Sequence, residues 1–293
     1  KITVSVFKHN FYDKEILGLL SDFAIDFASD KSHFSTLPAD IIMDCGGGHA
    51  NISSNYGYIE LTQSGFAHYK NTDKTVFLAD QSACKLLETT FGTGESFVRA
   101  MAELGYDDLN KKIIVIFGAG KVGKGIAYFC QNAGAEVFLV DDSSKCKVNE
   151  NTNLIDWRDF DKQKEVLEKA FCIVTATGVK NALAKHPIIP DLIKSKTLFA
   201  NMGVEDEFGE AIKDKKRILN NNLALNFSLE EPTHLTLIEP IMALSNRAML
   251  KIKNKEFPPG LIYPPKEMDQ EIFNTLKTKG KLQKHIHRVM NDE

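Results

Sequence analysis

A glycine-rich turn between an apolar strand and a helix constrains the fold of this chain more than any other feature. Residues 113–117 are IIVIF, an apolar run that predicts a buried strand, and the turn GAGKVGKG follows at once. Apolar side chains then recur at helical spacing up to Ala133, and a second strand is expected at 136–140. A strand, a helix and a strand within about 30 residues predict a βαβ unit with parallel strands and a right-handed crossover.

Three glycines of this turn, Gly118, Gly120 and Gly123, have the spacing G-x-G-x-x-G. The first permits a tight turn, the second lets the backbone approach a pyrophosphate, and the third lets the helix pack on the strand. The helix N-terminus adds unpaired N–H donors and a partial positive charge. Asp141 lies 18 residues after Gly123, at the end of the second strand. A carboxylate there accepts both ribose hydroxyls of NAD and repels the extra phosphate of NADP, so the sequence predicts NAD as the cofactor.

Two alternatives to this interpretation stay open. The glycines also suit an ordinary turn in which Asp141 caps a strand. Lys121 and Val122, the first helical residues, belong to the predicted cofactor contacts. Lys121 and Lys124 flank the turn and suit phosphate contacts, but lysines at the exposed start of a helix are more often solvated.

The rest of the chain alternates strands and helices on both sides of this unit. Before it, we expect strands at 2–7, 40–43 and 75–78, a helix at 12–27, a loop at 29–37, and one kinked helix or two tandem helices at 81–104. After it come expected helices at 162–170 and 190–194, strands at 171–176 and 197–201, an apolar segment at 235–252, a Pro-rich stretch at 257–265 and a solvated amphipathic tail at 277–288.

This alternation predicts an α/β protein with a doubly wound Rossmann-type parallel sheet and a second, smaller α/β domain. The expected NAD-binding domain spans 105–231. The smaller domain spans 1–104, includes the linking helix, and is completed by 232–293.

Composition excludes several classes of protein. The 293 residues carry 36 basic and 39 acidic side chains, a net charge of -3, so no positive field attracts nucleic acid. Five cysteines without a CxxC pair fit neither a disulfide framework nor a zinc site, which favours a cytoplasmic location. No apolar run has membrane-spanning length, and we expect no signal peptide because no basic-then-apolar pattern opens the sequence. The chain begins at Lys1 rather than Met, so we expect a few residues to be missing or trimmed.

The segment VIFGAGKVGKGIA resembles the cofactor domain of the S-adenosylhomocysteine hydrolase family. Four further segments keep the order and spacing of that family: FGTGES at 91–96, VTATG at 174–178, NMG at 201–203 and FPPGLIYPPKEMD at 257–269. The resemblance covers roughly residues 39–280.

The resemblance implies a two-domain protein, homodimeric, with NAD in the cleft and Asp141 on the adenosine ribose. It places Thr175, Ala176, Thr177 and Gly178 along the cofactor, and Asn201 and Gly203 near the nicotinamide. It further implies that Thr62, Gln63, Ser64 and Thr89 face the nicotinamide ribose and that Asn246 keeps a cofactor contact. For Thr175 and Thr177, the alternative is that they are β-branched residues at a strand end.

This chain lacks several of the residues that carry out the family's chemistry. The family oxidises a ribose hydroxyl, eliminates homocysteine, adds water and reduces again, which needs positioned acids and bases. Its second acid in D-D-G-G-D is here Cys45, its catalytic lysine falls at Cys84, and its histidine in N-x-G-H is Val204. Its C-terminal Lys/Tyr segment has no counterpart here, and the first region is shorter than the family's substrate domain.

The remaining acid/base candidates are Asp44, Glu60, Lys85 and Glu88. For Glu60, Lys85 and Glu88 the alternative is a residue on a solvated face. Cys45 and His49 suit a nucleophile and base, or Cys45 is a buried small hydrophobe. His234 suits a proton shuttle or a structural role, and we expect no metal.

Three functions remain for the whole chain. The first is an NAD-dependent oxidoreductase-type enzyme that acts on a different, smaller substrate, held between residues 44–48, 60–64 and 201–203. The second is a non-catalytic NAD-binding or sensory protein. The third is a divergent S-adenosylhomocysteine hydrolase.

Overall fold

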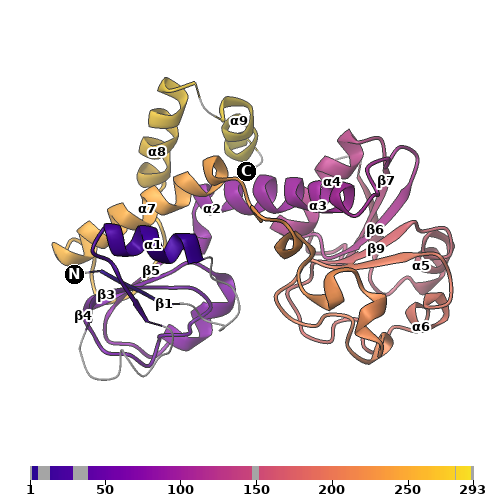
Figure 1. Cartoon of the computed structure of the whole chain (residues 1–293), viewed down its shortest axis with the longest axis horizontal. Coiled ribbons are helices and arrows are strands. Elements are labelled where there is room, and N and C mark those ends of the chain that lie inside the picture. The colour runs from indigo at the N-terminus through magenta and orange to yellow at the C-terminus, as the bar shows by residue number, and fades with distance from the viewer. Residues whose placement is uncertain (1, 6–13, 29–38, 147–151, 281, 292–293) are drawn as a thin grey trace. The chain divides into compact units, whose positions relative to one another are not determined.

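The computed structural model describes residues 2–5, 14–28, 39–146, 152–280 and 282–291 (Figure 1). The chain divides into two compact units, each with its own parallel sheet. The first unit comprises 1–85 and 241–279, and the second comprises 86–240 and 280–293. The dividing points therefore lie at Leu86 and Ile241, rather than at 105 and 232 as the sequence suggests. Most of the linking helix and the C-terminal tail group with the second unit.

The second unit is built on a five-stranded parallel sheet. Its strands are β6 (Ile113–Phe117), β7 (Glu136–Asp141), β8 (Asn153–Asp156), β9 (Cys172–Thr175) and β10 (Leu198–Asn201). Their order is β10-β9-β6-β7-β8, so the chain runs outward from β6 in one direction and then in the other. The order reverses between β6 and β9, which is where a doubly wound sheet binds its ligand. The predicted Rossmann-type α/β fold is confirmed.

Helices cover both faces of this sheet. On one face, α3 (Gly94–Glu103) and α4 (Lys121–Asn132) pack against Ile114 and Ile116 of β6. On the other, α5 (Phe160–Leu167) and α6 (Ile189–Leu192) pack against Val115 and Phe117. Because both faces are buried, the strands have continuous apolar sequences rather than alternating ones.

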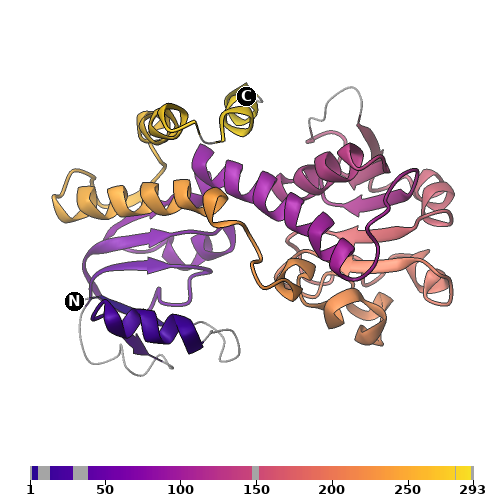
Figure 2. The same cartoon turned by 45° about the horizontal axis from the view of Figure 1, so that its top comes forward.

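The predicted kinked helix is one continuous helix with a widened turn. It comprises α2 (Ala83–Leu87), a π-helical stretch at 88–93 and α3. Figure 2 shows its α3 end running beside α4. A Cβ at Gly125 of α4 would collide with the carbonyl of Thr90, so a glycine is required where these helices meet. Gly92 and Gly94 lie in this helix without ending it.

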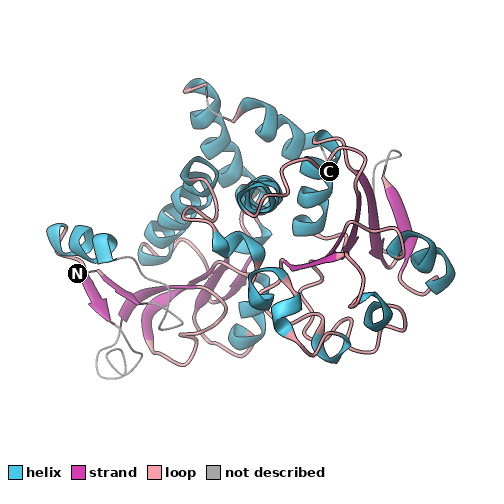
Figure 3. Cartoon of the chain, turned by 45° about the vertical axis from the view of Figure 1, so that its right-hand side comes forward, coloured by secondary structure: helices cyan, strands magenta, loops and turns pink. Residues whose placement is uncertain are grey.

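The first unit contains a four-stranded and a two-stranded parallel sheet (Figure 3). The order of the first is β11-β5-β4-β3, with β3 (Ala39–Asp44), β4 (Ser54–Glu60), β5 (Thr75–Leu78) and β11 (Gly260–Ile262). The second pairs β1 (Thr3–Ser5) with β2 (Asp26–Ala28). Its helices are α1 (Lys14–Asp22) and α8 (Lys266–Thr278), and α7 (Leu235–Lys253) enters this unit at Ile241.

Two predicted elements of the N-terminal region differ from the structure. The helix expected at 12–27 ends at Asp22, because Ala24 has φ +52° and the chain then pairs as β2. The expected strand 2–7 is β1, and its last two predicted residues lie outside the described residues, as does the loop expected at 29–37.

The C-terminal helix α9 (Gln283–Asn291) is amphipathic as expected but is not fully solvated. Ile286 and Val289 are buried in the second unit, and the ring of His285 lies 4.8 Å from that of Phe91. Among the described helices, none combines the length and the apolar character that crossing a bilayer requires.

Candidate cofactor-binding site

The turn after β6 has the geometry that the three glycines predict. Gly118 has φ +107°, and a Cβ there would collide with the carbonyl of Ala176 after β9. A Cβ at Gly123 would collide with the carbonyl of Gly118, so α4 packs directly on the turn. Gly120, by contrast, is exposed and has open space where its Cβ would lie. The turn therefore presents bare backbone at the N-terminus of a 12-residue helix.

Asp141 is fixed against this turn. One carboxylate oxygen accepts a hydrogen bond from the Ala119 N–H at 2.6 Å, and the other accepts from the Asp142 N–H at 2.6 Å. The cation that comes next along the sheet edge, Arg158, is already paired with Asp156 at 2.7 Å and with Asp142 at 3.5 Å. Beside Asp141, the structure therefore places a negative group and an arginine, Arg158, that is already paired with carboxylates.

The ends of β9 and β10 are joined by the amide of Asn201. Its Oδ1 accepts from the Thr175 hydroxyl at 3.1 Å and from the Gly203 N–H at 2.9 Å. Its Nδ2 donates to the carbonyls of Glu205 and Asn222 at 2.8 and 3.0 Å. Thr175 and Asn201 are both completely buried, so they shape the site from beneath.

Glu207 holds the turn after β9. Its fully buried carboxylate accepts from the Thr177 N–H and hydroxyl at 2.8 and 2.7 Å, and from the Gly178 N–H at 2.8 Å. Burial raises the pKa of Glu207, and the bonds from Thr177 and Gly178 partly oppose that rise. Sequence reasoning missed this residue, because nothing local distinguishes it from Glu205 and Glu210, which are exposed.

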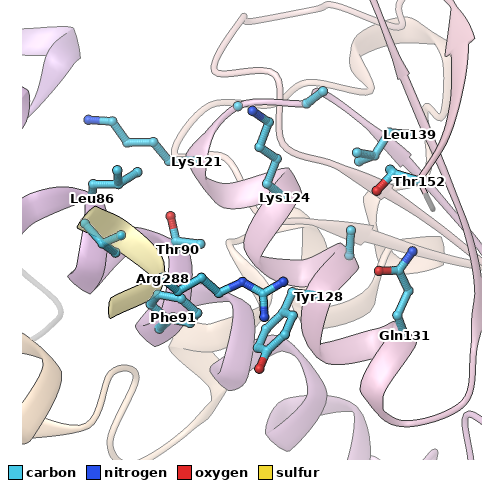
Figure 4. A pocket seen from close by; sticks show the side chains of 14 residues that line it. Leu86, Thr90, Phe91, Lys121, Lys124, Tyr128, Gln131, Leu139, Thr152 and Arg288 are labelled. Atoms are coloured by element: carbon cyan, nitrogen blue, oxygen red, sulfur yellow. The ribbon is translucent and has the colours of Figure 1, made fainter. Parts of the chain in front are cut away.

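A cavity of about 340 Å³ runs along α4 from the glycine turn (Figure 4). Three basic side chains reach it: Lys121, Lys124 and, from α9, Arg288. The guanidinium of Arg288 lies 4.1 Å from the ring centroid of Tyr128, a cation–π contact. The further lining residues are Leu86, Thr90, Phe91, Ala119, Gly120, Ala127, Gln131, Leu139, Thr152 and Val289. The tail thus adds a cation to the neighbourhood of the turn, which sequence reasoning did not anticipate.

The remaining expected cofactor contacts fall into two groups. Val122 is partly buried in the core beside α3, and the Thr89 hydroxyl donates to Glu88 at 3.0 Å, both within the second unit. Thr62, Gln63, Ser64 and Asn246 belong to the first unit. The Thr62 hydroxyl donates to Glu60 at 2.6 Å, Gln63 accepts from Gln81 at 2.7 Å, Ser64 donates to Thr62 at 3.3 Å, and Asn246 is exposed on α7.

In the first unit, Asp44 is a buried carboxylate at the end of β3 with four donors around it. It accepts from the Tyr69 hydroxyl at 2.6 Å, the His49 N–H at 2.8 Å and the Cys45 N–H at 2.9 Å, and it pairs with His49 Nδ1 at 3.0 Å. Burial alone would raise its pKa, but the bonds from Tyr69, His49 and Cys45 outweigh that effect and lower it. Asp44 therefore stays ionised and orients the imidazole of His49.

Glu60, at the end of β4, holds the glycine turn that follows Asp44. Its fully buried carboxylate accepts from the N–H groups of Gly46, Gly47 and Thr62 at 3.0, 2.9 and 2.7 Å. Cys45 on this turn is exposed, so the alternative that it is a buried hydrophobe is wrong. A second cavity, of about 190 Å³, is lined by Met43, Asp44, Cys45, Ile59, Leu61, Met242 and Ser245.

The positions expected from the resemblance near α2 have structural contacts. Cys84 is completely buried, and burial followed by the nearby Asp269 carboxylate raises the pKa of its thiol. Asp269 accepts from the N–H groups of Ala83 and Cys84 at 3.0 and 2.9 Å and so caps α2. Lys85 and Glu88 are half-buried.

His234 lies at the start of α7 and pairs with Glu231 at 2.8 Å. Glu231 also accepts from the Leu235 N–H at 2.9 Å, which is typical of a helix cap. Within the described part of the chain, no group of His, Cys, Asp and Glu side chains has the geometry to hold a metal ion.

Comparison with known proteins bears on this geometry. Residues 89–222 match the family model described as S-adenosyl-L-homocysteine hydrolase, NAD binding domain. The chain is 26% identical over 268 residues to an adenosylhomocysteinase of Sulfolobus acidocaldarius, covering 85% of this chain and 62% of that protein. It is 27% identical over 208 residues to the adenosylhomocysteinase of Sulfurisphaera tokodaii, covering 65% and 48%. The chain thus spans less than two thirds of the length of these relatives.

Among solved structures, D-lactate dehydrogenase of Aquifex aeolicus, complexed with NAD and lactic acid, has a TM-score of 0.39 at 12% identity over 99% of this chain and 98% of that one. A likeness this remote says nothing about the reaction. The family match confirms the predicted resemblance and the predicted cofactor, NAD.

Proposed function

We propose, from the match of residues 89–222 to the NAD-binding domain of S-adenosyl-L-homocysteine hydrolase, that this chain is an NAD-dependent oxidoreductase-type enzyme acting on a different small molecule. One observation carries the proposal most directly. The exposed backbone at Gly120 opens the N-terminus of α4, while Asp141 is fixed beside it by Ala119.

The residues of the second unit fit NAD part by part. A pyrophosphate would approach the bare turn at Gly120, where helix N–H groups and the lysines at 121 and 124 favour negative charge. Asp141 would accept the adenosine ribose hydroxyls. When bound, the nicotinamide ring would accept a hydride or donate one.

Asp141 should select NAD over NADP. We expect Asp141→Asn to weaken NAD binding about tenfold and to bring the affinities for NAD and NADP closer together. The amide keeps an acceptor for the Ala119 N–H but loses the charge that repels a ribose phosphate. Isothermal calorimetry with both cofactors measures this. The exposed Asp161→Asn on α5 is the control for charge, and equal affinity of the wild type for NAD and NADP would refute the role of Asp141.

A different substrate is supported by the groups that replace the family's acids and bases. Cys84 is a buried thiol, and Val204 is 80% exposed and has no group that can exchange a proton. Of the acid/base candidates, Asp44 and Glu60 have their oxygens engaged by the glycine turn and its neighbours. We propose His49, oriented by Asp44, as the proton-transferring group of the first unit, with Lys85 and Glu88 as the remaining candidates.

The same replacements favour a second candidate, a non-catalytic NAD-binding protein. The test follows absorbance at the NADH band while purified protein is mixed with NAD and a panel of nucleosides, hydroxy acids and amino acids. Turnover of any one of these refutes the non-catalytic candidate. Release of adenosine from S-adenosylhomocysteine would instead identify a divergent hydrolase.

The setting of this activity is also a proposal. The net charge of -3 and the free cysteines support a cytoplasmic protein that takes a small-molecule substrate rather than nucleic acid. A homodimer follows from the family resemblance alone. Light scattering after size-exclusion chromatography measures the subunit number.

A further inference from the structure

The segment after β10 clamps the turn after β9 from one side. Two backbone bonds join them: Asn181 N–H to the Asp206 carbonyl at 2.8 Å, and Leu183 N–H to the Glu207 carbonyl at 2.9 Å. Phe208, next in the chain, is completely buried in the core of the second unit. The segment is therefore anchored independently of the Glu207 carboxylate.

The Glu207 carboxylate occupies the hydrogen-bond donors of the turn. Consecutive N–H groups at the carboxyl end of a strand, here those of Thr177 and Gly178, are donors of the kind that bind phosphate. Both donate to Glu207, and so does the Thr177 hydroxyl. A second anion at this turn would find the Thr177 and Gly178 N–H groups already donating to the Glu207 carboxyl.

Gly203 makes room for this carboxylate. A Cβ at Gly203 would collide with Oε1 of Glu207. The glycine of the N-M-G segment is thus required by packing against Glu207, in addition to the cofactor contact expected of it from the resemblance.

We propose that Glu207 is a positioning residue that sets the direction in which the dinucleotide lies. The carboxylate excludes phosphate from the ends of β9 and β10 and confines the pyrophosphate to the open turn at Gly120. The nicotinamide half of NAD, with its ribose and its carboxamide, then lies against the turn that Glu207 fixes. This inference rests on the proposed binding of NAD to the second unit.

The test compares NAD with ADP, a probe that lacks the nicotinamide half. We expect Glu207→Gln to weaken NAD about tenfold in calorimetry, because the amide NH2 would face an N–H donor and release the turn. ADP, which reaches only the glycine turn and Asp141, should keep its affinity within about twofold. Glu210→Gln is the control, because it removes the same charge from an exposed side chain of the same segment. This variant should bind NAD and ADP like the wild type.

Two results would overturn the inference. Unchanged NAD affinity in Glu207→Gln would show that the carboxylate does not position the cofactor, and equal weakening of NAD and ADP would show a merely structural role. A wild type that binds neither probe refutes the proposed function itself, and the inference with it.

If Glu207→Gln does not fold at room temperature, a measurement on the wild type still tests the inference. Hydrogen exchange of the ligand-free protein should show the amides of Thr177 and Gly178 protected, because they donate to a buried carboxylate. Rapid exchange at both amides would contradict the clamp.

Discussion

At the scale of single residues, the glycines were predictable and the carboxylates were not. Gly118, Gly120 and Gly123 each answer a local requirement of one turn, so their spacing in the sequence carries the information. The burial of Glu207 depends on where β9 and β10 bring distant segments together, and neighbouring acids in its own segment are exposed. Asp44 and Glu60 were predicted as acid/base groups, and that role stays a prediction. Their contacts support a second role, holding the glycine turn of the first unit.

Asp44 should stabilise the first unit in a pH-dependent way. Its folded-state pKa lies below the ordinary 3.8, so its contribution is present above that value and is lost as pH falls through the lowered pKa. We expect Asp44→Asn to reduce the free energy of unfolding at neutral pH by about 1–3 kcal/mol. Near about pH 3 the difference from the wild type should shrink.

Urea titrations at the two pH values measure this effect. Asp73→Asn is the control, because it removes the same charge from an exposed side chain of the first unit. It should change the free energy of unfolding little at either pH. A deficit in Asp44→Asn that stays the same at both pH values would contradict the assignment.

At the scale of elements, the sequence predicts those strands whose burial is continuous. β6, β9 and β10 are buried on both faces and have uninterrupted apolar runs. Four of the described strands were missed: β2 lies at the end of the predicted helix 12–27, β4 is interrupted by Gly57 and polar residues, β8 is four residues long, and β11 lies in a Pro-rich stretch. Pairing with neighbours, rather than local sequence, makes these segments strands.

The C-terminal helix offers a test at this scale. Ile286 of α9 is completely buried, and we expect Ile286→Ala to lower the free energy of unfolding of the second unit by about 2–4 kcal/mol through the cavity it leaves. Thermal unfolding followed by circular dichroism measures this. Lys284→Ala changes an exposed side chain of the same helix and should leave the midpoint in place. An equal midpoint for both variants would show that α9 is not packed as described.

At the scale of the whole molecule, the expected cofactor contacts divide between two units. The glycine turn, Asp141, the 175–178 turn and Asn201 with Gly203 belong to the second unit. Thr62, Gln63, Ser64 and Asn246 belong to the first. The doubly wound topology was predictable because strands and helices alternate in the sequence at regular spacing. The boundaries were not, because α7 and the linking helix are continuous through the dividing points.

The central claim is that NAD binds at the open turn of the second unit, and calorimetry with Gly120→Val tests it most directly. A Cβ at Gly120 meets nothing within 4 Å, so the variant should fold with the thermal midpoint of the wild type. Its side chain would stand where the pyrophosphate approaches, and we expect binding to weaken at least about a hundredfold. NAD binding to a folded Gly120→Val with wild-type affinity would contradict the account.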